Sequence, residues 1–260
     1  MRYITPDHCI ASRLEGRPAP SWPVALLVFR DHPASQKVLK AFPHVRPVRY
    51  RLLYNMTSPD FEPFVFEADT SEGTIVVVTR CVWGGPQVAI LVEELAALGA
   101  RFHVGYGIAG SIDPDLPPGH LVLAASAVTS DGTSKAYGAL PDLQAHADLI
   151  RAGVAAAAKT GCEIDVVTAA TIDALYRETP AVIDDLRGRG AQIINLETSP
   201  FYAASEACGI QSIWLGYVSD HLKRQKWQDW YTNLGDASEK ALGVCRGLLA
   251  AILCEQGEHF

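Results

Sequence analysis

The sequence lacks several features that would place it in a specialised class of protein. Its six cysteines form no CxxC pair, so we expect neither a disulfide framework nor a zinc site. No stretch approaches the roughly 20 consecutive apolar residues that cross a bilayer. Acidic residues outnumber basic ones, and the resulting net charge of −7 argues against a nucleic-acid partner. The sequence therefore indicates no nucleic-acid partner and no membrane partner.

Targeting and low-complexity segments are also missing. The first residues, MRYITPDHCIAS, contain no apolar signal core, so we expect a cytoplasmic protein. Neither an internal repeat nor a biased segment is visible. The chain has 260 residues and is 48% hydrophobic, which is enough for a substantial core. Because no linker divides it, we expect a single domain over residues 1–260, with residues 1–22 as a proline-rich N-terminal arm.

Strand-like and helix-like segments alternate along the chain. The expected strands are short apolar runs bounded by Gly or Pro, over residues 23–29, 74–80, 101–106, 120–128 and 163–168. The expected helices cover residues 34–42, 87–98, 143–160, 180–189 and 237–253. Residues 49–54 and 63–68 are expected to pair as two further strands. This alternation predicts an α/β fold with a largely parallel sheet.

The stretch Gly190–Leu222 carries the clearest functional pattern. It predicts a strand, a helix and a second strand, over residues 192–196, 199–208 and 213–218. Glu197 follows the first strand and Asp220 follows the second. Parallel strands joined by a helix end at the same edge of a sheet, which is where α/β proteins bind ligands. Both carboxyl groups are therefore expected at one site.

Two acids at one site suggest a division of labour. An ionised carboxylate can accept hydrogen bonds from a vicinal diol, whereas a part-buried carboxyl with a raised pKa can act as a general acid. Either residue alone is more often structural, since Glu197 would cap the next helix and Asp220 would begin a turn. Together, and with the motifs described below, they favour a catalytic site.

Three glycines, Gly105, Gly107 and Gly110, cluster where the strand over residues 101–106 is expected to end. Glycines at a strand end allow a ligand to approach the backbone closely. The pattern is not a dinucleotide fingerprint, because prolines follow it directly instead of a helix. The chain also has no P-loop lysine and no GxSxG serine.

Six motifs between Gly73 and Leu222 resemble those of the nucleoside phosphorylase and nucleosidase superfamily. They are GGPQVAILVEELAALGA, GIAGSI, PPGHLVLAASAVTSDGTSKAY, TIDALY, INLE and VSDH, in that order. The resemblance implies a three-layer α/β sandwich with a mixed, partly barrel-like central sheet flanked by helices. It implies cleavage of the N-ribosidic bond of a purine nucleoside or a 5′-modified purine nucleoside. It implies no metal and no organic cofactor, and assembly as a homodimer or as a hexamer built from three dimers.

The resemblance also assigns roles to individual residues. Glu197 takes the position that holds the ribose 2′- and 3′-hydroxyls, and Asp220 takes the position that protonates, or hydrogen-bonds, purine N7. Leu196 replaces a methionine that packs on the sugar, and Asn195 stands where the family has another Glu. The remaining expected pocket residues are Leu175 and Tyr176 around the base, with Ser219, Gly107, Ile108, Ala109 and Gly110 along the two strands.

The residues with which phosphorylases of this family hold phosphate are replaced. Arg30 and Ala34 stand at the positions of a Gly and an Arg after the first strand, and Gly105 and Ile108 at those of an Arg and a Ser or Thr. An Ile side chain cannot donate a hydrogen bond, and losing Arg side chains weakens phosphate binding severely. We therefore expect water as the acceptor. The alternatives are a phosphorylase whose anion site is rebuilt from Arg30 and Arg80, and a nucleoside-binding protein without catalysis.

A hydrolase also needs a group that orients or deprotonates water. In the family's nucleosidases a Glu after the first strand does this, and the candidates here are Asp31 and His32. Each of these, taken singly, is more typical of a polar loop. Arg30 and Arg80 are as typical of a solvated strand end as of an anion site.

Overall fold

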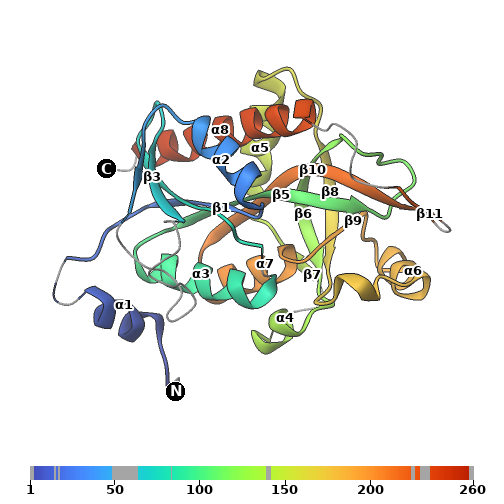
Figure 1. Ribbon diagram of the computed structural model, residues 1–260, viewed down its shortest axis with the longest axis horizontal. Coiled ribbons are helices and arrows are strands. Elements are labelled where there is room, and N and C mark those ends of the chain that lie inside the picture. The colour runs from blue at the N-terminus through green and yellow to red at the C-terminus, as the bar shows by residue number, and fades with distance from the viewer. Residues whose placement is uncertain are drawn as a thin grey trace.

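The computed structural model describes residues 3–14, 16, 18–48, 64–82, 84–138, 142–223, 226–228 and 235–257. Over these residues a mixed sheet of 11 strands forms the centre of the molecule (Figure 1). The strands are β1 Val24–Val28, β2 Val45–Pro47, β3 Val65–Asp69, β4 Thr74–Val78, β5 Phe102–Ser111, β6 Leu121–Val128, β7 Asp142–Gln144, β8 Asp165–Thr171, β9 Ile193–Asn195, β10 Gln211–Lys223 and β11 Lys226–Gln228.

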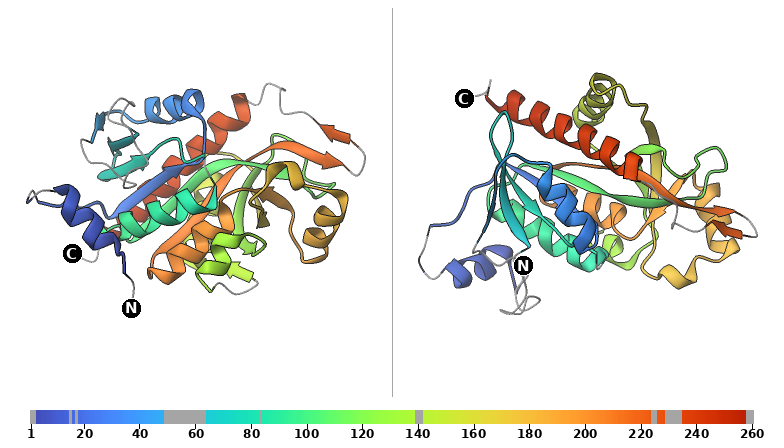
Figure 2. Two further views of the ribbon diagram at one scale, coloured as in Figure 1. Left: turned by 60° about the horizontal axis from the view of Figure 1, so that its bottom comes forward. Right: turned by 45° about the horizontal axis from the view of Figure 1, so that its top comes forward.

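Helices cover both faces of this sheet and make the outer two layers. They are α1 Pro6–Leu14, α2 His32–Lys40, α3 Gly85–Ala97, α4 Gly132–Ala136, α5 Ala147–Lys159, α6 Pro180–Gly188, α7 Thr198–Ala207 and α8 Gly235–Gly257, with a 3₁₀ turn, η1, at Leu175–Arg177. Figure 2 shows α5 and α8 on one side of the sheet and α3 and α7 on the other. No helix in the described part of the chain is long and apolar enough to span a bilayer.

Five strands close into a barrel. Strand β10 pairs with β6, β6 with β8, β8 with β9, β9 with β5, and β5 with β10 again. The pairs β6–β8, β8–β9 and β5–β10 are parallel, whereas β6–β10 and β5–β9 are antiparallel. The mixed, partly barrel-like sheet that the resemblance implies is thus confirmed. The largely parallel sheet expected from strand–helix alternation is wrong.

Strand β5 has two different neighbours along one edge. Strand β10 pairs with the whole of β5 on one side, and so β1 and β9 share the other side. Strand β1 pairs with residues 102–106 of β5 in parallel, and β9 pairs with residues 110–111 in the antiparallel direction. The carboxyl ends of β1 and β9 therefore approach each other from opposite directions, across residues 107–109 of β5. We call this interval the β5 gap.

Most expected elements are present with shifted ends. The strands over 23–29, 74–80, 120–128 and 163–168 and the helices over 34–42, 87–98, 180–189 and 237–253 correspond to β1, β4, β6, β8, α2, α3, α6 and α8. Gly99 and Gly209, just past α3 and α7, have φ of 92° and 67°, as expected for glycines that end helices. The expected strand over 49–54 lies outside the described residues.

Three expectations about local structure are wrong or incomplete. The strand from residue 101 does not end near Tyr106 but continues to Ser111, so the three glycines lie inside β5. The helix expected from residue 143 begins at Ala147, because residues 142–144 pair with β6 as β7. The segment expected as an N-terminal arm contains α1, whose Arg13 forms an ion pair with Glu94 of α3 at 2.6 Å.

The glycines of β5 serve close packing in the barrel. A Cβ on Gly105 would lie 2.8 Å from the Phe29 ring and 2.9 Å from Trp214. Gly107 pairs with Gly216 of β10, and a Cβ on Gly216 would lie 2.2 Å from the Gly107 carbonyl oxygen. A contact with backbone cannot be relieved by a side-chain rotation, so the β5–β10 pairing requires glycine at position 216.

We therefore expect Gly216→Ala to destabilise the protein by at least the ~1–3 kcal/mol that overpacking usually costs. The matched control is Gly243→Ala in α8, where an added Cβ meets no atom within 4 Å. This control should be neutral or slightly stabilising, because alanine is favoured over glycine in a helix. Urea unfolding of both variants measures the difference. Equal stability of the two variants would contradict the close β5–β10 packing.

Candidate active site

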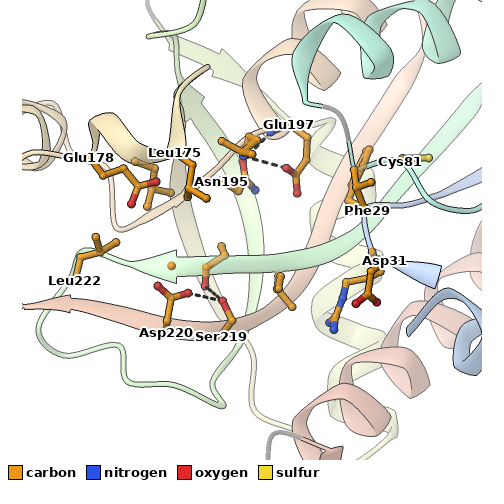
Figure 3. Close-up of a pocket in the computed structure, with 17 residues that line it drawn as sticks. Phe29, Asp31, Cys81, Leu175, Glu178, Asn195, Glu197, Ser219, Asp220 and Leu222 are labelled. Carbon is orange, nitrogen blue, oxygen red and sulfur yellow. Dashed lines mark hydrogen bonds between the residues drawn. The ribbon is translucent and has the colours of Figure 1, made fainter. Parts of the chain in front are cut away.

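A cavity of about 580 Å³ opens at the β5 gap. Its walls come from the ends of β1, β4 and β9, from the second half of β5, from the end of β10 and from the segment around η1 (Figure 3). The lining residues are Phe29, Arg30, Asp31, Cys81, Val82, Ile108, Ala109, Gly110, Leu175, Glu178, Ile194, Asn195, Leu196, Glu197, Ser219, Asp220 and Leu222. The two acids that the sequence singles out, Glu197 and Asp220, are both among them.

These two acids meet by a different route from the one expected. Strands β9 and β10 are not neighbours, and they run in opposite directions on either side of β5. Glycines of β5 make room for each carboxyl group. A Cβ on Gly107 would lie 3.2 Å from Glu197 Oε1, and a Cβ on Gly110 would lie 3.3 Å from Asp220 Oδ2. The glycine motif therefore accommodates the acids as well as the barrel packing.

Asn195 leaves the Glu197 side chain available to the pocket. Its Oδ1 accepts the backbone N–H groups of Glu197 at 3.3 Å and Thr198 at 3.1 Å. Its Nδ2 donates to Thr198 Oγ1 at 2.6 Å. Asn195 thus satisfies the first N–H groups of α7, the capping role that Glu197 alone would have been expected to take. Glu197 makes no side-chain capping bond to α7.

The Glu197 carboxyl is buried, with 8% of the residue exposed. Its Oε2 accepts the Leu196 backbone N–H at 3.0 Å. Burial raises the pKa of Glu197 to about 8, against smaller lowering effects of that N–H and of the Trp214 indole. Because so few donors surround the carboxyl, its environment favours the protonated form over an ionised carboxylate in the free protein.

A bulge in β10 directs Asp220. The register with β5 shifts between Val218 and Asp220, so Ser219 is the extra residue and Asp220 stands opposite Gly110. Bulges commonly re-aim a side chain in this way. The Ser219 hydroxyl is 2.6 Å from Asp220 Oδ1 and 3.2 Å from the Ala109 carbonyl oxygen. Ser219 thus holds one carboxyl oxygen, and Oδ2 remains directed along Gly110.

A third pocket acid, Glu178, was missed by sequence reasoning. It follows η1 directly and is half-buried. Burial, together with the negative charge of Asp220, raises the pKa of Glu178 to about 7. The signal that could have found it is its position three residues after Leu175, which was already expected at the base. The other missed lining residues are Phe29, Cys81, Val82, Ile194 and Leu222.

The remaining predicted residues divide between the pocket and its surroundings. Leu175 lines the cavity, but Tyr176 is 96% exposed and does not. Arg30 lines it, and its guanidinium donates to the Tyr217 hydroxyl. Arg80 is not a lining residue, and its backbone N–H donates to Ser35 Oγ at 3.3 Å.

The two candidates for water activation begin α2. Asp31 lines the cavity and also caps α2, because its Oδ1 accepts the Ala34 N–H at 3.1 Å. His32 is the first residue of α2, and its side chain lies outside what the structure describes.

Most of the ionisable side chains that line the cavity are acidic. Four of them have a carboxyl group (Asp31, Glu178, Glu197 and Asp220), whereas Arg30 is the only cationic side chain among the described lining residues. Within the described part of the chain, no three His, Cys, Asp or Glu side chains are grouped so that they could hold a metal ion. The cavity is therefore suited to proton transfer and to hydrogen bonding with an uncharged or cationic ligand.

Comparisons with known proteins show the family to which the chain belongs. The family model described as "Phosphorylase superfamily" matches residues 49–253. A uridine phosphorylase of Thermococcus kodakarensis is 30% identical over 206 residues, covering 72% of this chain and 70% of that protein. A guanosine phosphorylase of Halorubrum lacusprofundi is 30% identical over 146 residues, covering 54% of this chain and only 59% of that protein. A mimivirus relative, R802, is matched over 63% of its length.

Solved structures show the same fold. Purine nucleoside phosphorylase from Toxoplasma gondii, in complex with immucillin-H, superposes with a TM-score of 0.77 at 20% identity, over 90% of this chain and 93% of that one. The 5′-methylthioadenosine/S-adenosyl homocysteine nucleosidase of Campylobacter jejuni superposes with a TM-score of 0.73 at 14% identity, over 89% of this chain and 100% of that one.

The raised pKa of Glu197 predicts how stability depends on pH. The unfolded chain loses this proton near the reference pKa of 4.5, whereas the folded chain keeps it up to about pH 8. Stability should therefore fall as the pH rises through this interval, by up to about 1.4 kcal/mol per pH unit. Glu197→Gln removes the titrating group, so its stability relative to wild type should increase from pH 5 to pH 8.

Urea unfolding at pH 5, 6.5 and 8 measures this difference. Glu163→Gln, at an exposed position before β8, is the control and should follow the wild-type profile. If the difference between Glu197→Gln and wild type is the same at all three pH values, the raised pKa is wrong.

Proposed function

The chain belongs to the phosphorylase superfamily, and we propose that it cleaves the N-ribosidic bond of a purine nucleoside, or of a 5′-modified purine nucleoside, with water as the acceptor. The observation that carries the choice of water is the shortage of cationic groups in the pocket. Arg30 is the only cationic side chain among the described lining residues, which also carry four carboxyl groups. A phosphate anion needs several positively charged or N–H donors, whereas a neutral nucleoside and water do not.

The surroundings of the guanidinium support the same choice. Arg30 donates to the Tyr217 hydroxyl and lies over the Tyr217 ring, with 5.5 Å from its central carbon to the ring centroid. Part of its donor capacity is therefore already used. The neighbouring wall of the pocket is Ile108, which offers no donor to an anion. Strong phosphate sites usually combine several charge-assisted hydrogen bonds.

Asp220 is proposed to act at the base. As the C1′–N9 bond breaks, its electron pair moves into the purine, and a proton delivered to N7 relieves the negative charge that develops there. The Ser219 hydroxyl lies 2.6 Å from Oδ1 and so fixes the orientation of the carboxyl group that is proposed to deliver the proton to N7. In this arrangement Ser219 positions the carboxyl while Asp220 transfers the proton.

Glu197 is proposed to act at the ribose. Its carboxyl can bond to the 2′- and 3′-hydroxyls, and Glu197 lines the cavity at the β5 gap, where the sugar is proposed to bind. The two sugar hydroxyls donate hydrogen bonds that favour the ionised form of Glu197, and its proton passes to solvent as the substrate binds. Bond cleavage then leaves positive charge on the sugar beside this carboxylate. The carboxylate then stabilises the transition state more strongly than the bound substrate, which is the requirement for catalysis.

Water is proposed to attack C1′ from the side of β1. Asp31 lines the pocket there, and a carboxylate has capacity for further hydrogen bonds after capping one N–H group. It can accept a proton from the attacking water, so that free ribose and purine are the products. His32, which follows it at the start of α2, is the other candidate for this role.

A second candidate function is a phosphorylase with a rebuilt anion site. The position of Arg30 in the pocket wall favours it, because this side chain could rotate from Tyr217 to a phosphate. Relatives named for phosphorolysis of uridine and guanosine also favour it. The product distinguishes the two reactions, since phosphorolysis yields ribose 1-phosphate.

We expect the purified protein to release base and free ribose from at least one of adenosine, inosine, guanosine and methylthioadenosine, at the same rate with and without phosphate. Chromatography of the sugar product makes the measurement. Ribose 1-phosphate formed only when phosphate is present would contradict hydrolysis, and Arg30→Ala should then abolish the reaction. No base released in either buffer would instead support a nucleoside-binding protein.

We expect Asp220→Asn to lower kcat by roughly 10²- to 10⁴-fold, the usual contribution of a general acid. Nucleoside binding, measured by calorimetry, should be retained because an amide oxygen can still accept the Ser219 hydroxyl. Asp165→Asn is the control, since Asp165 forms an exposed pair with His120 and does not line the pocket. Full activity of Asp220→Asn would exclude Asp220 as the acid.

A further inference from the structure

Resting on the proposed function, we propose that Glu178 determines specificity for the base. In this proposal Glu178 and Asp220 form a pair of carboxyl groups that contacts the purine 6-substituent and N7, and the pair favours 6-aminopurine over 6-oxopurine nucleosides. Neither the family resemblance nor the motif around Leu175 assigns a function to Glu178.

The first support is the arrangement of the pocket. Figure 3 shows Glu178 on the same side of the cavity as Leu175, Asp220 and Leu222, while Phe29, Cys81 and Asp31 lie on the other side. We call the first group the base end. Two leucines there offer apolar contact to a flat ring, and the two carboxyl groups offer polar contact to its edge. Glu197, next to Gly107, lies between the base end and the other side.

The second support is the electrostatic coupling of the two acids. Each comes from a different element, Asp220 from β10 and Glu178 from the turn after η1. The charge of Asp220 reaches Glu178 strongly enough to raise the pKa of Glu178, in addition to the effect of burial. Two carboxyl groups that repel in this way share a proton instead of both ionising. Near neutral pH the pair therefore offers one donor and one acceptor site.

This pattern matches the edge of a 6-aminopurine. N7 is an acceptor and the adjacent 6-amino group is a donor, so together they need one proton and one ionised carboxylate from the pair. In the free protein the proton rests on Glu178, whose pKa is raised, and in this proposal it passes to Asp220 when Asp220 bonds to N7, so that the Glu178 carboxylate accepts from the 6-amino group. A 6-oxopurine presents O6, an acceptor, at the same place. It would face the Glu178 carboxylate without a proton between them, so its binding and cleavage are disfavoured.

The size of the effect follows from the exposure of the site. Sites that are built to hydrogen-bond a substrate group reject analogues lacking it very strongly when they are fully buried. Glu178 is only half-buried, so water can partly replace the lost contact. We expect wild-type kcat/KM to be roughly 10- to 100-fold higher for adenosine than for inosine.

Glu178→Gln tests this directly. An amide offers both a donor and an acceptor, so it can serve either 6-substituent. The adenosine-to-inosine ratio of kcat/KM should fall toward one, with adenosine becoming a worse substrate and inosine a better one. Glu163→Gln, at an exposed position outside the pocket, is the matched control and should keep the wild-type ratio.

Two results would overturn the proposal. One is a wild-type enzyme that prefers inosine. The other is a Glu178→Gln variant whose ratio stays within twofold of wild type, including the case in which both substrates slow equally, as a merely structural role would cause. Failure of the proposed function is separate, because it would appear as no base released from any nucleoside. In that case, calorimetry measures the dissociation constants of adenosine and inosine for wild type and for Glu178→Gln. The ratio of these two constants then tests the base preference in place of the ratio of kcat/KM.

Discussion

The functional architecture depends on the way β1 and β9 share one edge of β5. Because β1 is parallel to β5 and β9 is antiparallel, their carboxyl ends converge on the β5 gap. Arg30 and Asp31 follow β1, and Glu197 follows β9, so all three residues line the same cavity. The barrel fixes this geometry, since β9 can reach β5 only when the five-strand ring closes. The fold and the site are therefore consequences of one pairing pattern.

Glycine is the residue that makes this pattern possible. Three glycines on β5 and one on β10 let an indole, a phenyl ring and two carboxyl groups lie against the barrel wall. Glu197 is consequently buried beside backbone, and Asp220 is partly buried there. For Glu197, that environment raises the pKa to about 8, a cost to the folded state that the proposed chemistry recovers when positive charge forms on the sugar.

The sequence predicted the elements with strong local signals and the two principal acids. Apolar runs such as Val24–Val28 and helices that end at Gly99 and Gly209 needed no tertiary information. What could not be predicted from local pattern was the barrel, because the antiparallel pairing of β9 with β5 joins residues about 80 positions apart. Glycines normally indicate a turn, so the sequence predicts the end of this strand near Tyr106, whereas β5 continues to Ser111. Glu178 was missed because its neighbour in space, Asp220, comes from a distant strand. The capping by Asn195 was missed because an amide there was interpreted only as a replaced acid.

Glu178 belongs to no strand of the barrel, and it follows a short turn whose neighbours Leu175 and Tyr176 are exposed. A change at this position therefore costs the fold little, whereas a change at Gly107 or Gly216 disturbs the barrel wall. With Glu178 as the proposed determinant of base specificity, mutation and selection can alter which base is accepted while the residues proposed to act at the sugar stay constant. New nucleobase preferences can then arise by substitution in one surface turn, without destabilised intermediates.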